Sequence, residues 1–326
     1  MYLRTHLRRA GALALAIVAG CTTHSALAQA GYPARAVRVV VPYPAGGNTD
    51  VITRAVMKEV SVRMGQPFVI DNKPGGNSIL GTDIVAKAAP DGYTLLVVIG
   101  AFANNKWLYK TLPYGPDDLV PVTQMSRTSL VLVSTPQLAT KNMRDFLTAV
   151  RPSGQATYAS SGIGSAAHLL GERFAQAANF KATHIPYKGT ADAMNDLVGG
   201  RVSFMFDAVS AVGAQIRAGK LDALAVTGDA PSAQLPGVPT LVELGYPQLV
   251  SYAWAGLLAP ARTPDAIRQR LATEIAEVLK GPELKERLAA ISTDAVGSTP
   301  AEFGRFLAEE SRVGAEVITK SHISLD

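Results

Sequence analysis

The chain has 326 residues, of which 48% are hydrophobic and 17% are charged, and its formal net charge is +5. Disordered chains carry more charge and less apolar content, and collagen-like repeats need far more than 29 Gly and 20 Pro, so this composition excludes both and favours a folded core. At about 150 residues per domain, the length is typical of two domains.

The first thirty residues predict a secretory signal peptide. Three arginines within the first nine residues precede an apolar run over 10–19, and small and polar residues follow, ending in the Ala-Gln-Ala pattern at 28–30. The apolar run is shorter than the roughly 20 residues that span a bilayer, so we expect export and cleavage after residue 30. A lipoprotein signal over 1–20 with a lipidated Cys21 is the alternative, because 18–21 match a bacterial lipobox.

Cleavage after residue 30 changes both the charge and the cysteine content. The remainder has 28 basic against 26 acidic residues, a net charge of +2, and no cysteine. A near-neutral chain does not present the clustered basic face that nucleic-acid binding needs, so we expect no nucleic-acid partner. The absence of cysteine excludes a disulfide framework and a thiolate metal site in the cleaved chain.

The first third of the cleaved chain alternates short apolar runs with helical patterns. Strands are predicted at 37–41, 68–70 and 94–99, and a helix at 49–64. Apolar strands that alternate with helices indicate parallel sheets covered on both faces, which is the α/β class. Asp50 and Arg54 lie one helical turn apart and predict a surface ion pair.

The loop after the first strand, residues 42–50, has the composition of an anion-binding turn. Gly46 and Gly47 let the backbone approach a ligand, and Asn48 or Thr49 can cap the next helix, whose free N–H groups favour a carboxylate or phosphate. No Lys-Ser/Thr follows the glycines at P-loop spacing. A tight structural turn is equally consistent with the local sequence. The candidate ligand-binding residues here are Tyr43, Ala45, Gly46, Gly47, Asn48, Thr49 and Asp50.

A crossover between two lobes is predicted near residue 129. Apolar runs at 119–122 and 129–133, separated by the polar stretch 124–128, indicate two short strands without a helix between them. The strand–helix alternation then resumes. Strands are expected at 157–159, 183–185, 202–206 and 223–226, and helices at 165–178, at 190–198 and in the segment that ends at 218.

A second candidate loop lies between a strand end and a helix start. Ser160, Ser161 and Gly162 precede Ser165 at the helix start, and His168 lies one turn inside. Their hydroxyls and amides would receive a carboxylate, with a hydrogen bond from His168. A dinucleotide fingerprint would need a third glycine at 167, and a hydrolase elbow would need Gly-x-Ser-x-Gly, so neither fits. The alternative for His168 is a hydrogen-bonded core residue.

Two further strand ends carry candidate ligand-binding residues. Tyr187, Lys188 and Gly189 follow one strand, and Asp207 follows another. Ligands of α/β sheets bind at the carboxyl ends of strands, so these loops are expected to line one polar cleft. Lys188 would neutralise an acid or lie in solvent, and Asp207 would hold a ligand ammonium or a backbone amide. No short His spacing supports a metal site, so we expect no metal.

The C-terminal part is predicted to return to the first lobe. Residues 252–258 indicate a return strand, and 264–320 indicate three helices. We therefore place lobe 1 at 31–128 plus 253–326 and lobe 2 at 129–252, with a hinge and a cleft between them.

Many separate strings, in this order, resemble the Bug family, the extracytoplasmic solute receptors of tripartite tricarboxylate transporters. They lie at 39–50, 71–76, 86–96, 158–162, 168, 185–189, 205–207, 218–221, 235–240 and 256–260. The resemblance covers nearly the whole cleaved chain. Ala101 and Phe102 depart from it, since small hydroxyl residues are common there in the family, and Phe102 would favour a partly apolar ligand.

The resemblance implies a type II periplasmic-binding-protein fold, in which two α/β lobes close on a solute in the interlobe cleft. It implies a monomeric periplasmic receptor without cofactor or catalysis. The expected ligand is a small organic acid or acidic amino acid, and the expected partners are large and small membrane subunits of the transporter. The residues that would line the cleft are those of the four loops above, together with Ala101. The alternatives are a ligand sensor that presents its solute to a signalling partner, and an exported hydrolase that uses Ser165 and His168.

Overall fold

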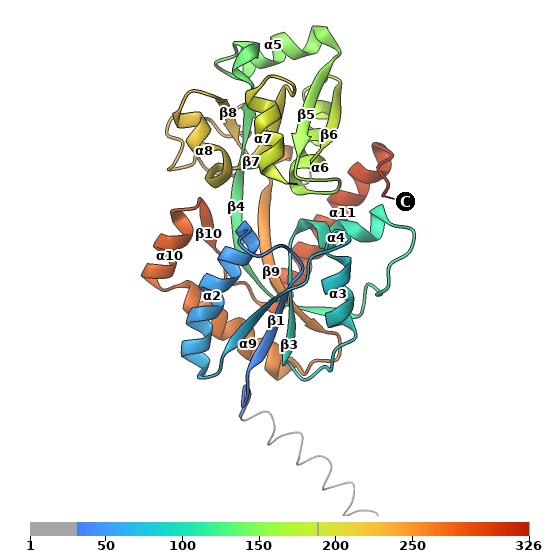
Figure 1. The fold of residues 1–326 in the computed structure, drawn as a ribbon, viewed down its shortest axis with the longest axis vertical. Coiled ribbons are helices and arrows are strands. Elements are labelled where there is room, and N and C mark those ends of the chain that lie inside the picture. Colours follow the sequence, from blue (N-terminus) through green and yellow to red (C-terminus); the bar gives the residue numbers. More distant parts are fainter. Residues whose placement is uncertain (1–30, 188, 326) are drawn as a thin grey trace, which may run out of the picture.

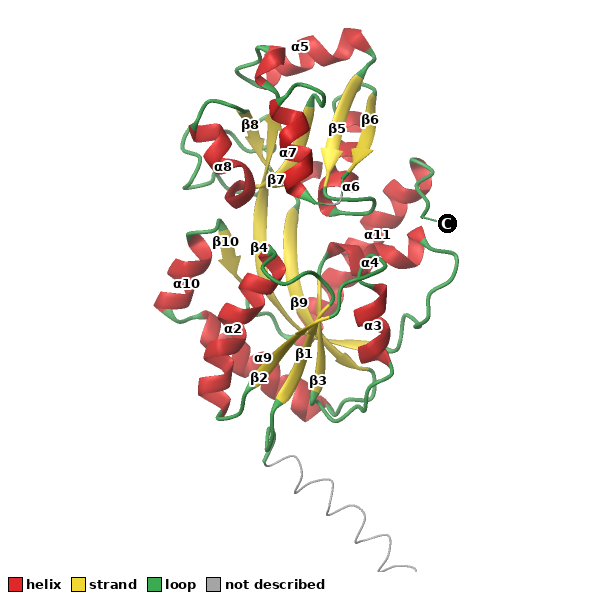
Figure 2. Ribbon diagram, viewed as in Figure 1, coloured by secondary structure: helices red, strands yellow, loops and turns green. Residues whose placement is uncertain are grey.

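A computed structural model describes residues 31–187 and 189–325 and consists of two α/β lobes (Figure 1). The predicted signal peptide, the alternative site at Cys21 and the candidate Lys188 lie outside the described residues. The predicted α/β class with two lobes and an interlobe cleft is confirmed. Two long strands, β4 (Leu119–Ser134) and β9 (Tyr252–Pro260), run from one lobe into the other (Figure 2).

Lobe 1 is built on a sheet whose parallel strands lie in the order β2-β1-β3, followed by β9 and β4 in antiparallel pairing. Its elements besides the two long strands are β1 (Val37–Val41), α2 (Asn48–Met64), β2 (Phe68–Asn72), α3 (Ile79–Ala86), β3 (Thr94–Val98), α4 (Gly100–Leu108), α9 (Asp265–Leu279), α10 (Pro282–Ala289), β10 (Thr293–Ala295) and α11 (Pro300–Lys320). The three C-terminal helices confirm the prediction for that segment.

Lobe 2 continues the sheet from the far end of β4, with β7, β5 and β6 on one edge and β8 on the other. Its elements are η1 (Pro136–Leu138), α5 (Met143–Ser153), β5 (Ala156–Ser160), α6 (Ala166–Ala177), β6 (Ala182–Pro186), α7 (Thr190–Val198), β7 (Phe204–Ala208), α8 (Val209–Arg217), β8 (Asp222–Val226) and η2 (Pro247–Leu249). Helix α7 has the predicted bounds.

The prediction of two short strands at 119–122 and 129–133 is wrong, because β4 is one strand of 16 residues. Its polar middle is stabilised by hydrogen bonds: Ser298 Oγ accepts from the Gln124 amide at 2.9 Å, and the hydroxyls of Thr128 and Thr293 lie 2.9 Å apart. A strand needs backbone partners, which β9 supplies, and does not need apolar side chains. The predicted lobe boundaries at 128/129 and 252/253 fall in these crossing strands and stay a prediction.

Each lobe has its own hydrophobic core. In lobe 1 the core packs valines of β1 and leucines of β3 against α2 and α9. In lobe 2 it is rich in aromatic rings, including Phe146, Phe174 and Phe204. A smaller cluster lies between the lobes: Leu108 of α4, Leu169 of α6, and Val317 and Ile318 of α11. In the described part of the chain, no helix has the length and apolarity that a membrane span requires.

Candidate ligand site in the interlobe cavity

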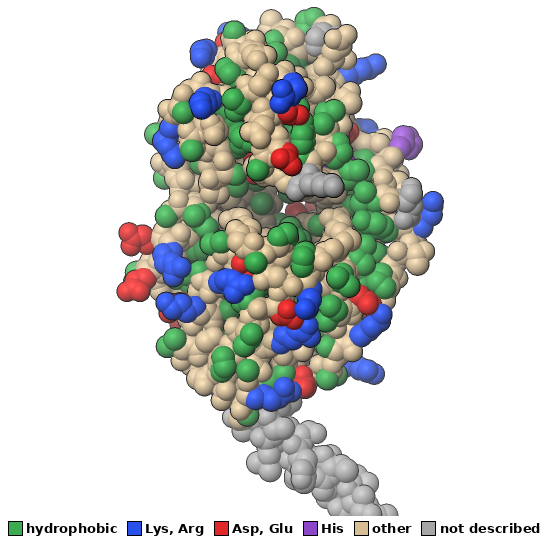
Figure 3. Space-filling view, viewed as in Figure 1, with side chains coloured by type: hydrophobic (Ala, Val, Ile, Leu, Met, Phe, Trp, Pro, Cys, Tyr) green, Lys and Arg blue, Asp and Glu red, His purple; other side chains and the backbone are tan. Residues whose placement is uncertain are grey.

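A cavity of about 310 Å³ lies between the two lobes. The space-filling view shows a hollow at this level of the molecule (Figure 3). Its lining residues are Tyr43, Asn48, Thr49, Ile52, Asn77, Ile99, Gly100, Ala101, Ser126, Thr128, Leu130, Ser161, Gly162, Ile163, Ser165, Ala166, Ala167, Asp207, Ala253, Trp254 and Ala255. Of the predicted residues, the structure brings together Tyr43, Asn48, Thr49, Ala101, Ser161, Gly162, Ser165 and Asp207.

The lobe 1 wall is formed by the N-termini of two helices. Asn48 and Thr49 begin α2, and Gly100 and Ala101 begin α4. Neither helix has an N-cap side chain that accepts a hydrogen bond from its first N–H groups. The first N–H groups of a helix have no acceptor within the helix, and they lie at the positive end of its dipole. This wall therefore offers unused donors to an anion.

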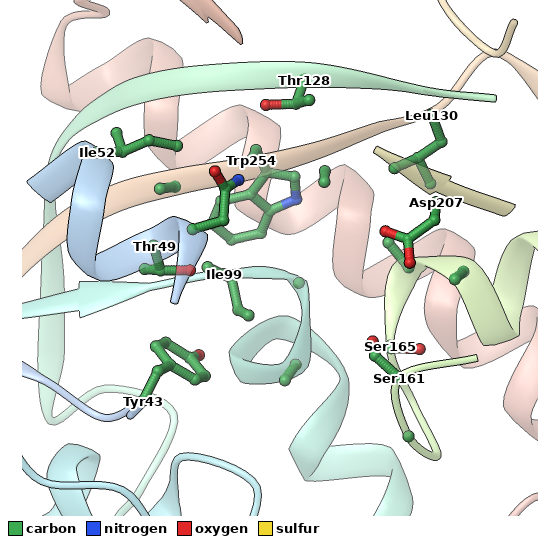
Figure 4. A pocket seen from close by; sticks show the side chains of 18 of the residues that line it. Tyr43, Thr49, Ile52, Ile99, Thr128, Leu130, Ser161, Ser165, Asp207 and Trp254 are labelled. Atoms are coloured by element: carbon green, nitrogen blue, oxygen red, sulfur yellow. The ribbon is translucent and has the colours of Figure 1, made fainter. Parts of the chain in front are cut away.

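Tyr43 adds an aromatic side chain to this wall. Its side chain lies beside Thr49 and Ile99 on the same side of the cavity (Figure 4). The hydroxyl oxygen is buried, and the Ser78 side chain and the Ile99 backbone lie near it. Burial raises the pKa of Tyr43, so the phenol stays protonated.

The loop behind this wall is held by Asp50, which does not line the cavity. The Asp50 carboxylate accepts hydrogen bonds from the Gly46 amide, from Arg54 Nε and from Asn72 Nδ2, each at 2.9 Å. Burial raises the pKa of Asp50, but the hydrogen bonds that it accepts lower it by more, so its pKa lies below the usual value. The predicted pair with Arg54 exists, although the Asp50 side chain is only 3% exposed.

Ala45, Gly46 and Gly47 also lie outside the cavity lining. Gly46 has a φ of 80°, which few residues other than glycine adopt, so its role is in the turn. The structure thus divides the predicted loop into residues that face the cavity and residues that shape it.

The lobe 2 wall consists of the loop before α6 and the end of β7. Ser161, Gly162 and Ser165 face the cavity, and Ser165 Oγ accepts from the His168 amide at 3.2 Å as the N-cap of α6. Asp207 also faces the cavity, across from Tyr43 and Thr49 (Figure 4).

The Asp207 carboxylate already has protein partners. It accepts from the Thr190 hydroxyl and from the Ala208 amide, both at 2.7 Å. Burial raises the pKa of Asp207. Of the two predicted roles, the one with a backbone amide is therefore present in the structure.

Four predicted residues do not line the cavity: Ser160, His168, Tyr187 and Gly189. Ser160 and His168 are buried behind the loop. His168 Nδ1 accepts from the Gly164 amide at 3.0 Å, and burial lowers the His168 pKa to about 4, so the ring is neutral near pH 7. The Tyr187 hydroxyl donates to Asp196 at 2.6 Å. The core interpretation of His168 fits this position, and the predicted donation to a ligand does not.

The residues of the cavity floor are not among the predicted ones. They come from the crossing strands, with Ser126, Thr128 and Leu130 on β4 and Trp254 on β9. The Trp254 ring packs edge-on against two phenylalanines of α11, and its Nε1 donates to Glu310 at 2.8 Å. The polar alternation of Ser126 and Thr128 is the signal in the sequence, but it fits a break between two strands as well as one continuous strand.

Charge is scarce in this cavity. Among its described lining residues, Asp207 is the one charged side chain, and neither Lys nor Arg is present. In residues 31–187 and 189–325, no cluster of three or more His, Cys, Asp or Glu is arranged to hold a metal ion. Attraction for an anion at the lobe 1 wall therefore comes from backbone N–H groups and hydroxyls.

Comparisons with known proteins agree on one protein family. The sequence model described as "Tripartite tricarboxylate transporter family receptor" matches residues 52–323. The chain is 38% identical over 300 residues to "Protein BugT" of Bordetella pertussis, which covers 90% of this chain and 91% of that protein.

Solved structures are similar over nearly their full length. The R. palustris protein Rpa4515 with adipate has a TM-score of 0.80 and 31% identity, over 90% of this chain and 99% of that one. MatC from Rhodopseudomonas palustris with bound malate has a TM-score of 0.76 and 29% identity, over 88% of this chain and 100% of that one.

Proposed function

Because the chain belongs to the tripartite tricarboxylate transporter receptor family, we propose that it captures a small carboxylate-containing metabolite between its lobes and delivers it to the large and small membrane subunits of such a transporter. The chain is a solute-binding receptor of the periplasmic type. The ligand class that we propose is an organic acid or an acidic amino acid.

The observation that carries this proposal is the lobe 1 wall, where two helices without side-chain caps face one cavity beside the Tyr43 side chain. A carboxylate accepts several hydrogen bonds at once, so it suits a wall of donors better than a neutral solute does. The two related structures, which hold adipate and malate, support the same ligand class.

Lobe closure follows from the position of the site. The ligand would touch lobe 1 through Asn48, Thr49 and Ala101, and lobe 2 through Ser161 and Ser165. A ligand that contacts both lobes favours the conformation in which the lobes are close, since it stabilises a state in proportion to its differential affinity. The moving bodies would be the lobes placed at 31–128 plus 253–326 and at 129–252.

The first experiment measures thermal unfolding of the chain from residue 31 with malate, adipate, citrate, glutamate and benzoate. The diamides of malate and adipate serve as uncharged controls. A ligand at 100 times its dissociation constant stabilises by about 2.7 kcal/mol, so a binding acid should raise the melting temperature while its diamide does not. Equal shifts with acid and diamide, or no shift with any acid, would contradict the proposal.

Delivery, export and oligomeric state need separate measurements. Uptake of the radiolabelled acid should fall when the receptor gene is deleted and should recover when it is restored. The mass of the protein isolated from the periplasm distinguishes cleavage after Ala30 from a lipidated Cys21. Light scattering should give the mass of one chain, since we propose a monomer.

A further inference from the structure

The loop that joins β5 to α6 is held from both lobes at one residue, Gly164. We call residues Ser160–Ser165 the ligand loop, because Ser161, Gly162 and Ser165 face the cavity. Its Gly164 carbonyl accepts from Asn104 Nδ2 of lobe 1 at 3.1 Å, and its Gly164 amide donates to His168 Nδ1 of lobe 2 at 3.0 Å.

The position of Gly164 leaves little freedom for other residues. Its φ of 78° is in the left-handed region, and a Cβ atom there would meet Leu108 Cδ1 at 2.3 Å. Asn104 is equally confined, since a Cβ at Gly314 of α11 would lie 2.0 Å from Asn104 Oδ1. The close approach of α4, α11 and the ligand loop is therefore built on two glycines.

The other end of the loop is held by a second imidazole. His184 Nε2 lies 2.7 Å from Ser160 Oγ, which also accepts from the Gly162 amide at 3.2 Å. The rings of His168 and His184 are stacked, with centroids 3.7 Å apart and planes inclined by 14°. Two packed imidazoles thus connect both ends of the ligand loop behind the cavity.

The hydrogen bond from Gly164 fixes the protonation state of His168. A backbone N–H can only donate, so Nδ1 must be an unprotonated acceptor and the ring proton must lie on Nε2. The contact is lost if Nδ1 gains a proton.

We propose that Asn104, His168 and His184 are positioning residues, which hold the ligand loop in the form that faces the cavity and tie it to lobe 1 without touching the ligand. Asn104 connects the loop to α4, whose first residues Gly100 and Ala101 line the opposite wall. The two walls are thereby placed relative to each other by a hydrogen bond that lies outside the cavity. The effect on affinity rests on the proposed function, whereas the effect on the loop does not.

The first test measures hydrogen exchange of peptides that cover the ligand loop, in the ligand-free chain from residue 31. His168→Ala removes the acceptor of the Gly164 amide, and Asn104→Leu removes the donor to its carbonyl. We expect each to speed exchange of the loop about tenfold, as for the loss of one partner of a buried hydrogen bond. His168→Asn should stay within about twofold of the wild type, because its Oδ1 can take the place of Nδ1. His322→Asn, at an exposed position near the C-terminus, is the matched control.

The double variant sharpens the test. Asn104 and His168 both bind the backbone of Gly164, so the double variant should speed exchange by less than the product of the two single accelerations. His184→Ala should speed exchange of the segment around Ser160 more than that around Gly164.

The second test titrates the same proteins with L-malate and with adipate by calorimetry. For whichever acid the wild type binds, His168→Ala should weaken affinity about tenfold, and His168→Asn should restore it. If the wild type binds neither acid, the proposed function fails for these acids, and the exchange experiment still decides the positioning role.

Two results would overturn the inference. One is loop exchange within twofold of the wild type in both His168→Ala and Asn104→Leu. The other is an Asn variant at 168 that behaves like the Ala variant, since this would assign the effect to ring packing and not to the acceptor.

Discussion

The two walls of the cavity are built in opposite ways. On lobe 1, α2 and α4 begin without side-chain caps, and their first N–H groups are free for a ligand. On lobe 2, Ser165 caps α6, and the loop in front of it is bonded to side chains of both lobes. The charge differs as well, since the carboxylate of Asp207 lies on the lobe 2 wall.

This difference assigns separate tasks to the two walls. Unused donors on lobe 1 attract the charge of an acid, whereas the bonded loop on lobe 2 supplies a surface of defined shape against which lobe 1 can close. Added negative charge should therefore be most harmful on lobe 1, and changes behind the wall should matter most on lobe 2. The predictions below test these two statements in order of decreasing effect.

The largest effect is expected from Gly100→Asp at the start of α4. A Cβ at Gly100 has no atom within 4 Å, so a side chain can start there, and we expect its carboxylate to lie beside that of the ligand. Two charges about 4 Å apart repel by roughly 4 kcal/mol at an effective dielectric constant of about 20, so affinity for the acid should fall by two to three orders of magnitude. Calorimetry with the acid found by thermal shift measures this.

Gly100→Asn is the matched neutral control for this change and should keep most of the affinity. Stability separates repulsion from misfolding, because an acid in the first turn of a helix stabilises it by about 0.3–1 kcal/mol. Equal loss of affinity in the Asp and Asn variants would contradict the claim that the lobe 1 wall attracts the negative charge of the ligand.

The next effect concerns the pH dependence of lobe 2. Burial lowers the pKa of His168 from 6.5 to about 4, so between these pH values the unfolded chain takes up a proton that the folded chain does not. Stability should therefore fall as pH drops from about 6.5 to 4, by about 3 kcal/mol from this residue, and the loss should level off below pH 4. Urea unfolding at several pH values gives the number of protons that each protein takes up when it unfolds. Between pH 4 and 6.5 this number should be larger for the wild type than for His168→Asn, by close to one proton.

The groups around His168 are the same in both proteins. They are Tyr158 on β5, Glu172 on α6 and His184 on β6, whose own pKa is lowered to about 3, first by burial. Parallel pH profiles for the two proteins would show that His168 is not held neutral in the folded state.

The third effect is expected behind the lobe 1 wall, from Asp50→Ala. Its buried carboxylate holds the Gly46 amide and Arg54, and the lost partners should cost about 2 kcal/mol of unfolding free energy. Asp71→Ala is the control, because Asp71 pairs with the half-exposed Arg38 at the surface, where such pairs contribute about 0–1 kcal/mol. Equal losses in the two variants would contradict the anchoring role of Asp50.

Much of the fold could be predicted because apolar spacing and turn residues follow local rules. The strand β1 and the helix α7 are examples. Helix α4 was not predicted, since its sequence GAFANNKWL contains Gly and two Asn, which favour helices weakly. It forms where it packs on α11, and no local pattern shows that contact.

The site was predictable at strand ends and not in the crossing strands. Asn48 and Ser161 follow strands and Asp207 is the penultimate residue of β7, so the rule that ligands bind at carboxyl ends locates them. Ser126 and Trp254 reach the cavity because β4 and β9 run past it, which depends on a pairing between segments more than 120 residues apart. For His168 the expected hydrogen bond to the ligand is replaced by one to the loop, because its ring accepts from the Gly164 amide. Sequence position alone does not distinguish a residue that binds the ligand from one that supports the binding loop.

The smallest effect is expected from Asp207→Asn on the lobe 2 wall. A bound dianion such as adipate or malate is repelled by the Asp207 carboxylate, although burial, which raises the pKa of Asp207, reduces the charged fraction. The amide keeps a partner at Thr190, whose hydroxyl now lies 2.7 Å from Asp207 Oδ2, so the wall should hold its shape. We expect affinity for the dianion to rise about threefold, or roughly 0.7 kcal/mol, with a smaller change for a monoanion such as benzoate. Weaker binding in this variant would instead mean that the Asp207 carboxylate accepts a hydrogen bond from a donor group of the ligand, as it would from the ammonium of an amino acid. Both walls would then take part in recognising the ligand's polar groups.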